Sequence, residues 1–382
     1  MQNAFYIIIS LAAVIEMLYI FLMIYFICGL LRSKNYKVGK TICSTSVSVI
    51  IAVRNEAANI KECLNSVSLQ AYPKELFEVI IIDDSSEDET PDIVMNICTL
   101  NPNFRFFSMK NLQPVASGKK SAIEEGIKNS RGNLIVTTDG DCLVSENWLK
   151  TIVSFYETEK PKMILAPVTF HSEKNSFQKI QALEFSGLMS ITQSATTLNR
   201  PIICNGANLA YEKTAFENVS GFSGMPEIAS GDDVLLMHKL KEKIPNAIKF
   251  LGHEDAVVST KPQLNFSSFF DQRRRWASKA KLYSDKFSFF VSVLVYLSNF
   301  CIPFSLIFAL ISLNLHNIFL WLIVAGFKCL IDFLFLFLAA RKTGKISLMK
   351  YFFAAEFFVI AYVSLLAFVN SKTYNWKGRK VK

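Results

Sequence analysis

Two carboxylates lie two residues apart at Asp139 and Asp141, separated by Gly140. They follow the apolar run at residues 134–136, which is typical of a buried strand in a parallel sheet. Such sheets bind ligands outside the carboxyl ends of their strands, and Gly140 permits a tight bend there. Carboxylate oxygens at this spacing suit a hard divalent cation, Mn²⁺ or Mg²⁺, which can in turn bind a diphosphate. Taken alone, the same residues also fit a solvated Asp-Gly turn, so other positions must decide.

Three further groups of polar residues stand where a strand ends, a helix begins or an apolar segment approaches. They are Asp83-Asp84 after an apolar strand, Gly231-Asp232-Asp233 before an apolar helix at 234–240, and Gln272-Arg273-Arg274-Arg275-Trp276 before a long apolar segment. Taken singly, each has a structural explanation as a turn, a helix cap or a juxtamembrane basic run. Together they offer carboxylates that can bind a cation or accept a proton, and a guanidinium that can stabilise negative charge.

The composition predicts a membrane protein with a sizeable folded part outside the membrane. The chain has 382 residues, enough for about two or three domains. It is 51% hydrophobic, has 33 Phe and is only 19% charged, which is apolar for a soluble protein. The net charge of +9 suits anionic headgroups and an anionic nucleotide, whereas no nucleic-acid-binding motif is visible. Eight cysteines without a Cys-x-x-Cys pattern indicate reduced structural thiols rather than a disulfide or zinc framework.

Four apolar segments approach or exceed the length of about 20 residues that spans a bilayer. They lie at residues 5–31, 287–313, 318–340 and 351–369. The first lacks a basic leader and a small-residue cleavage site, so we expect a retained transmembrane helix rather than a signal peptide. Lys328 and Asp332 lie four residues apart in the third segment, where we expect them to pair on one helix face. For Glu16 in the first segment we expect a buried carboxyl, hydrogen-bonded or protonated, and a functional role is the alternative.

The distribution of basic residues predicts the orientation in the membrane. Arg32, Lys34, Lys37 and Lys40 follow the first segment, and only uncharged residues precede it. The positive-inside rule therefore places the N-terminus outside and the residues from 32 onward in the cytoplasm. Four spans would leave the basic tail at 371–382 outside, although its charge favours the inside. Two alternatives stay open, namely a fourth full span at 351–369 or a re-entrant or surface hairpin there.

Strand-like and helix-like patterns alternate between residues 46 and 211. Strands are expected at 47–53, 78–82, 104–109, 134–138 and 163–170. This alternation predicts an α/β fold with a mostly parallel sheet covered by helices. Residues 174–198 read as an amphipathic helix that suits core packing or a membrane surface, and the basic-aromatic stretch 265–286 is typical of a helix at headgroup level.

These patterns divide the chain into five segments. They are a transmembrane helix at 1–31, a cytoplasmic α/β domain at 32–262, an interfacial amphipathic segment at 263–286, a membrane region of two or three spans at 287–370, and a basic tail at 371–382.

The four polar groups, in this order and between membrane segments, resemble the membrane-bound family-two glycosyltransferases. That group includes hyaluronan, chitin, cellulose and poly-N-acetylglucosamine synthases and ceramide glucosyltransferase. The resemblance covers residues 46–276, and its most specific part is the Gln-x-x-Arg-Trp pattern at Gln272, Arg275 and Trp276. It implies a GT-A fold, which is a nucleotide-sugar-binding α/β fold with a mostly parallel sheet, flanked here by transmembrane helices.

The resemblance also implies a role for each matching residue. On the nucleotide side, the matches are Val53 and Glu56 in the turn after the first strand, Asp83 and Asp84 as the contacts to uracil and ribose, and Lys119 as a basic residue near the nucleotide. For the metal and the diphosphate, they are Asp139 and Asp141, with Asp139 also contacting the nucleotide sugar. On the acceptor side, they are Asn205 and Gly206 under the donor sugar, Asp233 as general base beside Asp232, and Gln272, Arg275 and Trp276 near the pyrophosphate and acceptor. The family commonly has Glu where this chain has Asp232.

The implied activity is that of an inverting, metal-dependent hexosyl- or N-acetylhexosaminyltransferase. It would move a sugar from a UDP-sugar to a membrane lipid or a growing glycan at the cytoplasmic membrane face, in the synthesis of a cell-envelope glycan or a glycolipid. Three or four spans are few for a polymer channel, which favours the lipid or short-glycan acceptor. A processive polysaccharide synthase of the hyaluronan or poly-N-acetylglucosamine type is the alternative, and a non-catalytic membrane scaffold that binds nucleotide sugars is a third hypothesis. The donor sugar, the acceptor and the oligomeric state are left open.

Overall fold

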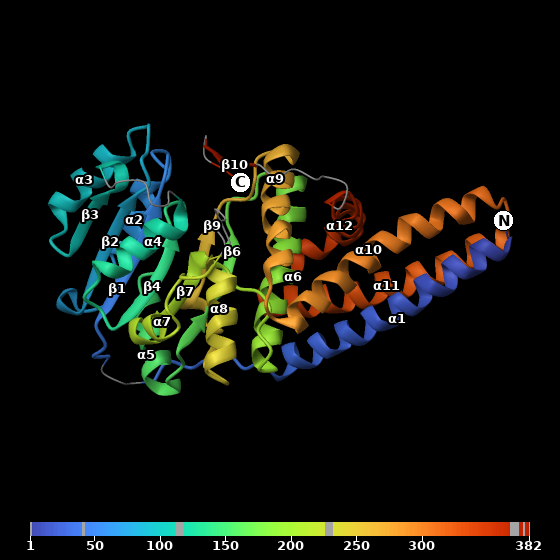
Figure 1. Cartoon of the computed structure of the whole chain (residues 1–382), viewed down its shortest axis with the longest axis horizontal. Helices are drawn as coiled ribbons and strands as arrows, with labels where there is room; N and C mark the ends of the chain where they lie inside the picture. Colours follow the sequence, from blue (N-terminus) through green and yellow to red (C-terminus); the bar gives the residue numbers. More distant parts are fainter. Residues whose placement is uncertain are drawn as a thin grey trace. The chain divides into compact units, whose positions relative to one another are not determined.

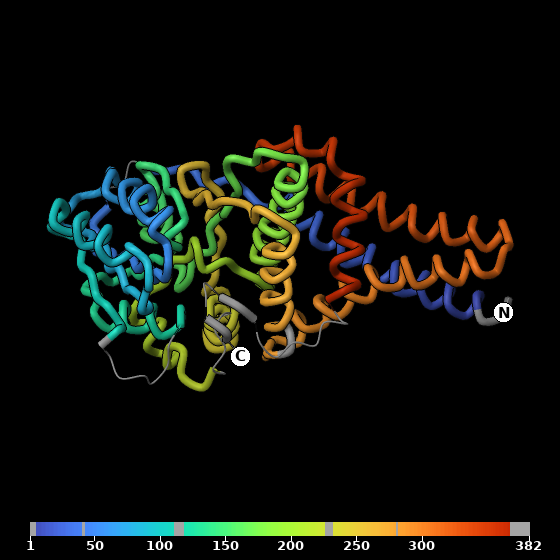
Figure 2. Tube along the Cα trace, turned by 90° about the horizontal axis from the view of Figure 1, so that it is seen from above, coloured from blue at the N-terminus to red at the C-terminus, as the bar shows by residue number. Residues whose placement is uncertain are grey.

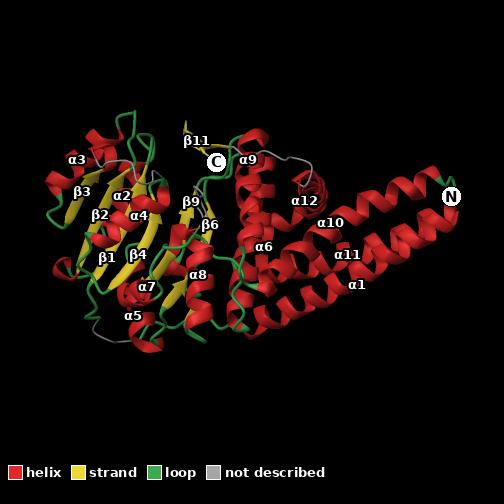
Figure 3. Cartoon of the chain, viewed as in Figure 1, coloured by secondary structure: helices red, strands yellow, loops and turns green. Residues whose placement is uncertain are grey.

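The computed structural model describes residues 2–39, 43–111, 118–225, 232–366, 374–376 and 379–381. These fall into two compact units, which are treated separately. The α/β unit comprises Lys34–Ser172, Thr196–Lys261 and Thr373–Lys382, and the helical unit comprises Met1–Ser33, Glu173–Ala195 and Pro262–Lys372. All the strands that the structure describes, yellow in Figure 3, belong to the α/β unit. Residues 173–195, which the sequence pattern assigns to the α/β domain, group here with the apolar helices.

A seven-stranded sheet forms the centre of the α/β unit, with the order β3-β2-β1-β4-β7-β5-β8 (Figure 1). Its strands are β1 (Val47–Val53), β2 (Phe77–Asp83), β3 (Phe104–Ser108), β4 (Leu134–Asp139), β5 (Met163–Leu165), β7 (Leu209–Glu212) and β8 (Ile248–Phe250). The first four strands pair in parallel, and β5 pairs in parallel with β8. Only β7 runs antiparallel among these strands, between β4 and β5. The predicted α/β class with a mostly parallel sheet is therefore confirmed.

One predicted strand is wrong, because residues 163–170 form two short strands in different sheets. β5 ends at Leu165, and β6 (Val168–Phe170) pairs in parallel with β9 (Val258–Thr260) in a separate two-stranded sheet. Pro167 lies between them and has no N–H with which to continue a ladder. Its carbonyl instead accepts a hydrogen bond from Val258 N–H at 3.0 Å, so the chain changes sheets at this residue. A third small sheet pairs β10 (Tyr374–Trp376) with β11 (Arg379–Val381).

Helices cover the sheet because their apolar residues recur at helical spacing. They are α2 (Ile60–Ser68), α3 (Thr90–Leu100), α4 (Lys119–Lys128), α5 (Trp148–Glu159), α7 (Lys213–Asn218) and α8 (Asp232–Lys243). α2 buries Ile60, Cys63, Leu64 and Val67, which is the i, i+3, i+4, i+7 stripe of a helix packed on a core. α4 packs on the sheet through Ala122, which clusters with Ile80 and Ile82 of β2. This packing carries the first residue of α4 to the sheet edge discussed below.

The helical unit is built from α1 (Gln2–Arg32), most of α6 (Ser176–Thr197), α9 (Phe266–Ser278), α10 (Lys286–Ile311), α11 (Leu315–Lys342) and α12 (Phe352–Leu366). Within the described residues, four helical segments are long and apolar enough to cross a membrane: Phe5–Arg32, Lys286–Ile311, Leu315–Lys342 and Ile346–Leu366. One of these candidate spans lies near the N-terminus and the other three lie in the C-terminal part. The last three residues of the expected segment 351–369 lie outside the described residues.

The fourth of these helices is oriented differently from the other three. α1, α10 and α11 run lengthwise in Figure 1, whereas the same view looks along the axis of α12. Figure 2, turned by 90°, shows α12 running across α10 and α11. α12 therefore runs across α10 and α11 instead of continuing beside them, and a full span and a hairpin at 351–369 both stay predictions.

Several charged and polar side chains within the apolar helices are paired. The predicted pair is confirmed, because Lys328 Nζ lies 2.7 Å from Asp332 Oδ2, and it also lies 2.6 Å from Glu356 Oε1 of α12. Tyr19 of α1 donates its hydroxyl to Asp332 Oδ1 at 2.6 Å. Glu16 is buried and accepts a hydrogen bond from the Ser298 hydroxyl at 2.8 Å, as expected for a buried, hydrogen-bonded carboxyl. These bonds connect α1, α10, α11 and α12. They specify how far each helix is shifted along its neighbours, which contacts between apolar side chains alone would specify less strictly.

Candidate active site

The strand register brings the predicted carboxylates to one edge of the sheet. Val53 at the end of β1 lies opposite Asp83 at the end of β2, and Ala52 lies opposite Asp139 at the end of β4. Because β7 is antiparallel, its first residue, Leu209, lies opposite Thr137, so the turn before β7 reaches the same edge. The Thr137 hydroxyl donates to the Gly206 carbonyl at 2.9 Å. The edge therefore combines three strand ends with one strand beginning.

The turn after β4 can offer oxygen ligands to a cation. Ligand atoms of Asp139, Asp141 and Cys142 all lie within 4.8 Å of one another. The two carboxylates are half-buried, and the Thr260 hydroxyl of β9 lies 3.3 Å from Asp141 Oδ2. Burial, and after it the Asp139 carboxylate, raise the pKa of Asp141, which is the electrostatic situation that a bound cation relieves. The two carboxylates of this group fit Mn²⁺ or Mg²⁺, since both ions favour oxygen ligands.

Position 140 must be glycine because the turn leaves no space for a side chain there. Its backbone is not in the left-handed region, in contrast to Gly118 and three other glycines of the described chain. A Cβ placed on Gly140 would lie 2.9 Å from Val53 Cγ1 and 3.3 Å from Glu56 Cγ. The sequence predicted a conformational reason for this glycine, and the structure gives a steric one. Its missing side chain lets the acidic turn pack directly on the end of β1.

Lys119 connects the acidic turn to the second acidic group. Gly118 has a φ of +133°, which L side chains rarely adopt, and α4 begins directly after it with Lys119. The Lys119 ammonium donates a hydrogen bond to Asp139 Oδ1. Burial alone would lower the pKa of Lys119, but Asp139 and Asp232, and then Asp233, outweigh it and raise that pKa. This lysine is therefore a fixed positive charge among carboxylates.

Asp232 and Asp233 open α8, with Asp232 buried and Asp233 half-buried. Asp233 Oδ2 accepts a hydrogen bond from Gly206 N–H at 2.9 Å, and its Oδ1 accepts one from Val234 N–H at 2.8 Å. A Cβ on Gly206 would lie 3.4 Å from Asp233 Oδ2 and 3.6 Å from Lys119 Nζ. Asn205 caps the short turn Gly206–Asn208 by accepting from Ala207 N–H at 3.0 Å. Lys119, Gly206 and Asp233 thus share one point at the sheet edge, while Gly231 of the same motif lies outside the described residues.

The residues predicted to contact the nucleoside line the ends of β1 and β2 and are largely buried. Asp83 and Asp84 are each 1% exposed, and Asp83 Oδ1 accepts from Ser86 N–H at 3.2 Å. Val53 and Glu56 are buried as well, and Glu56 Oε2 accepts a hydrogen bond from the Asn59 side chain at 3.0 Å. These buried, hydrogen-bonded residues therefore lie together where β1 and β2 end.

Sequence reasoning gave no role to Arg54, which organises the loop after β2. Its guanidinium is 4% exposed and donates to the carbonyls of Asp84 and Ser85, each at 2.6 Å. It also forms an ion pair with Glu87 at 2.9 Å. Ser85 has a φ of +57°, so this loop adopts a conformation that needs such support. A charged residue directly after an apolar strand was the available signal.

The Gln-x-x-Arg-Trp residues lie on α9, in the helical unit. Gln272, Arg275 and Trp276 are all half-buried there, and Arg273 between them is buried. The carboxylate cluster belongs to the α/β unit, so the two sets are described separately. The structure therefore brings together Asp139, Lys119, Gly206 and Asp233 of the predicted site, with Asp141 and Asp232 beside them.

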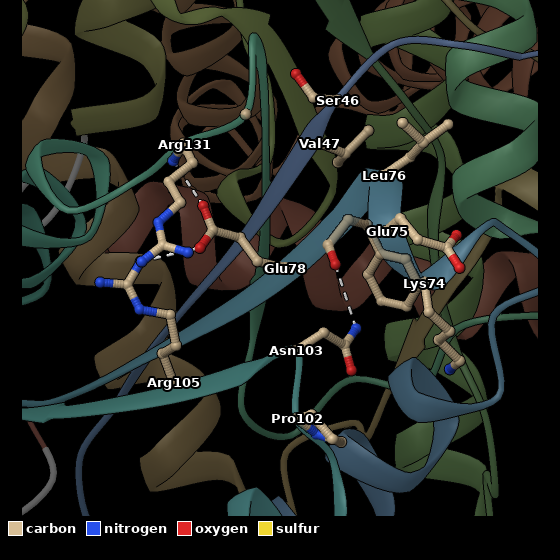
Figure 4. Close-up of a pocket in the computed structure, with 12 residues that line it drawn as sticks. Ser46, Val47, Lys74, Glu75, Leu76, Glu78, Pro102, Asn103, Arg105 and Arg131 are labelled. Carbon is tan, nitrogen blue, oxygen red and sulfur yellow. Dashed lines mark hydrogen bonds and ion pairs between the residues drawn. The ribbon is translucent and has the colours of Figure 1, made fainter.

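A cavity of about 230 Å³ lies at the opposite edge of the sheet (Figure 4). It is lined by residues at the amino ends of β1 and β2, such as Val47 and Phe77. Glu78 at its wall accepts hydrogen bonds from the Ser48 hydroxyl and Arg131 N–H, and it pairs with Arg105 at 2.9 Å. Burial would raise the pKa of Glu78, but these hydrogen bonds outweigh it and hold that pKa below its usual range. Glu78 is thus hydrogen-bonded and ion-paired by its neighbours at this wall, whereas carboxylates outnumber Lys119 at the acidic edge.

Comparison with known proteins relates the chain to transferases. Residues 48–220 match the family model described as Glycosyl transferase family 2. Glycosyltransferase AglE of Haloferax volcanii is 29% identical over 49% of this chain and 59% of its own length. Poly-beta-1,6-N-acetyl-D-glucosamine synthase of Staphylococcus epidermidis is 25% identical over 45% of this chain and 41% of its own. Beta-monoglucosyldiacylglycerol synthase of Trichormus variabilis is 23% identical over 60% and 48%. The chain spans about half the length of these curated relatives.

Among solved structures, the chain is similar to that of the mannosyltransferase PcManGT from Pyrobaculum calidifontis in complex with GDP-Man and Mn²⁺. The TM-score is 0.61 at 18% sequence identity, and the match covers 93% of this chain and 97% of that chain. At this identity the likeness shows the fold, which confirms the expected GT-A-like architecture.

Proposed function

We propose that this chain, whose residues 48–220 match the model of glycosyl transferase family 2, transfers a sugar from a UDP-sugar to a membrane lipid or a growing glycan. The observation that carries the proposal is the convergence of Lys119, Asp139 and Asp233 around Gly206 at one sheet edge. Such a transfer requires three groups: a carboxylate that binds a cation, a positive charge that stabilises the diphosphate, and a carboxylate that accepts a proton.

On the donor side, Asp139 and Asp141 would hold Mn²⁺ or Mg²⁺. When bound, this ion would supply positive charge against the negative charge that develops on the leaving diphosphate. Lys119 adds a fixed positive charge beside Asp139. Val53, Glu56, Asp83 and Asp84 are the proposed contacts for the nucleoside, since they lie at or just after the ends of the adjacent strands β1 and β2.

On the acceptor side, Asp233 is the proposed general base. The acceptor hydroxyl oxygen bonds to the anomeric carbon as the bond to the diphosphate oxygen breaks, and the hydroxyl proton passes to Asp233. Backbone N–H groups of Gly206 and Val234 hold the two carboxylate oxygens in place. Asp232, buried beside it, positions it, and Asn205 and Gly206 border the same point. A single displacement of this kind inverts the anomeric configuration.

Gln272, Arg275 and Trp276 are proposed to serve the pyrophosphate and the acceptor, as the sequence resemblance implies. The relatives named for a glucolipid synthase and for a poly-N-acetylglucosamine synthase support a lipid and a glycan acceptor respectively. The candidate membrane helices favour a lipid-soluble acceptor or one held at the membrane. A processive synthase is the second candidate, supported by the Staphylococcus epidermidis relative.

The general-base assignment can be tested with Asp233→Asn. We expect turnover to fall about 10²-fold or more, the scale of general-base contributions, while equilibrium UDP binding changes little. Asp232→Asn, measured on the same preparation, should cost less turnover. If Asp233→Asn kept near-normal turnover while Asp232→Asn lost it, the two roles would be reversed. Normal turnover in both variants would remove this motif from catalysis.

The donor and the acceptor class can be tested with purified membranes and a panel of radiolabelled UDP- and GDP-sugars. Transfer from a UDP-sugar into organic-extractable product supports a lipid acceptor, whereas label in high-mass product supports the processive alternative. Excess EDTA should abolish transfer, and Mn²⁺ or Mg²⁺ should restore it. Binding of nucleotide sugars without transfer to any acceptor would favour the non-catalytic scaffold instead.

The proposed orientation places the α/β unit in the cytoplasm and the loop between α10 and α11 outside. Single cysteines can be introduced at two exposed residues, Lys160 in the α/β unit and His316 at the start of α11, beside that loop. In sealed cells, an impermeant thiol reagent should label position 316 and leave position 160 unlabelled. Labelling at position 160 alone would reverse the orientation and separate the site from cytosolic nucleotide sugars.

A further inference from the structure

Arg273 is a buried charge at the centre of α9, between the residues of the Gln-x-x-Arg-Trp pattern. It is 4% exposed, whereas Gln272, Arg275 and Trp276 are half-buried. Arginine is almost never buried to this degree unless its charge is paired. Position 273 is also one of the two positions that the pattern leaves unspecified. Its surroundings therefore need an explanation of their own.

The guanidinium forms a two-pronged ion pair with Glu184 of α6. Arg273 Nε donates to Glu184 Oε1 at 2.9 Å, and the Nη2 group donates to Oε2. The Tyr362 hydroxyl of α12 donates to the same Oε1 at 2.6 Å. Glu184 is also nearly buried, at 6% of its side-chain surface. The planar fork of an arginine suits this carboxylate geometry, which a lysine ammonium cannot reproduce. The pair thus fixes α9 against α6 and α12.

The same guanidinium also contacts two residues of the pattern directly. Its Nη1 group donates to Gln272 Oε1 at 2.6 Å. Its Cζ atom lies 4.3 Å from the centre of the Trp276 ring and 4.4 Å from that of Phe269, which are cation–π distances. Thus one face of the Trp276 ring is occupied by Arg273, and Gln272 is held by a hydrogen bond to it. The orientation of both side chains depends on where Glu184 holds the guanidinium.

From these contacts we infer that Arg273 is a positioning residue, which, held by Glu184 and Tyr362, sets the orientation of Gln272 and Trp276 for the transfer reaction. This inference rests on the proposed function, because it assumes that the pattern acts on the pyrophosphate and the acceptor. A displacement of about 1 Å in a reacting arrangement can cost on the order of 10²-fold in rate. A buried fork that fixes two side chains at once is a direct means of preventing such a displacement.

The test is Arg273→Lys in the full-length protein in detergent or membranes. Lysine keeps the charge and most of the volume, but its point-like ammonium cannot engage two carboxylate oxygens, an amide oxygen and two aromatic faces together. We expect kcat/KM for transfer to fall about 10- to 100-fold. UDP binding, measured by calorimetry, should stay within about twofold of the parent. Arg274→Lys is the matched control, since Arg274 lies on the same helix and pairs with Asp271 at 3.0 Å.

A second readout separates positioning from simple stabilisation. Acrylamide quenching of Trp276, obtained by subtracting the spectrum of a Trp276→Phe variant, should increase in Arg273→Lys, because the ring loses its guanidinium cover. Glu184→Gln should have the same effect. The double variant Arg273→Lys with Glu184→Gln should be no worse than the more affected single variant, as for residues that act as a unit.

Each outcome bears on the inference. Transfer within about twofold of the parent in Arg273→Lys, with unchanged quenching of Trp276, would overturn it. A loss of folded protein without a change in kcat/KM per folded molecule would also overturn it, because the residue would then only stabilise the fold. If the parent protein transfers no sugar from any donor, the proposed function fails, while the quenching measurement still reports whether Arg273 positions Trp276.

Discussion

Replacing Lys119 with methionine should increase the affinity of the acidic cluster for Mn²⁺ in the absence of nucleotide. The Lys119 ammonium contacts the Asp139 carboxylate that the cation would use. It also lies near Asp232 and Asp233, which together with Asp139 keep its pKa raised against the effect of burial. The lysine therefore competes with a divalent cation for the same negative charge. Methionine has a similar length and no charge, so it removes the competition while filling the space.

The expected gain follows from the charges and their exposure. Two opposite unit charges about 4 Å apart interact by about 4 kcal/mol at an effective dielectric constant of about 20. The side chains of Lys119 and Asp139 are 23% and 33% exposed. Solvent therefore reduces the interaction energy of this pair well below about 4 kcal/mol. A remaining competition of about 1–2 kcal/mol corresponds to about 5- to 30-fold tighter Mn²⁺ binding.

The measurement is a titration of the purified full-length protein with Mn²⁺, followed by the electron paramagnetic resonance signal of free ion or by calorimetry. Lys128→Met is the control, because Lys128 is exposed at the far end of the same helix. UDP binding should weaken in Lys119→Met, since a positive charge near the diphosphate is lost. Unchanged or weaker Mn²⁺ binding in Lys119→Met, with a normal Lys128→Met, would refute the competition.

Three further predictions concern stability. Lys328→Met should destabilise the helical unit by about 3–5 kcal/mol, because Asp332 and Glu356 lose their positively charged partner. Adding Asp332→Asn and Glu356→Gln to this variant should restore most of the melting temperature in detergent. Gly140→Ala should cost about 1–3 kcal/mol and weaken Mn²⁺ binding, since the added carbon meets a side-chain carbon at 2.9 Å; a normal melt and a normal titration would contradict this. The depressed pKa of Glu78 means that its ionised form stabilises the fold above the usual Glu pKa and that this contribution is lost as pH falls through the folded-state pKa. Glu78→Gln should therefore flatten the loss of stability between about pH 5 and pH 3 in acid titrations followed by circular dichroism.

The first four strands along the chain and the acidic ends of β2 and β4 could be predicted because they depend on local patterns. Runs of apolar residues such as 47–53 must be buried on both faces, and a parallel strand of this kind requires a helix to return the chain. Parallel strands end at the same edge, so Asp83 and Asp139 had to lie near each other. The pairing of Lys328 with Asp332 followed from helical spacing in the same way.

Other features depended on where antiparallel and distant segments pack. The sequence offered no means of knowing that β7 inserts antiparallel between β4 and β5, which is what carries Gly206 to the edge. Residues 163–170 carry the apolar pattern of one strand, but Pro167 breaks the ladder and β9 provides a second partner. Whether a proline ends a strand or lies at an edge depends on which neighbours are available to it.

The contacts that define the candidate site were decided only by the tertiary structure. Asp233 meets Gly206 across 27 residues of chain, and Thr260 meets Asp141 across 119. The sequence determined the residue types: the carboxylates, the lysine after Gly118 and the Gln-x-x-Arg-Trp pattern. It could not determine that Glu184 and Tyr362 bind Arg273. The partner of a buried charge depends here on how α6, α9 and α12 pack, and not on the spacing of residues along the chain.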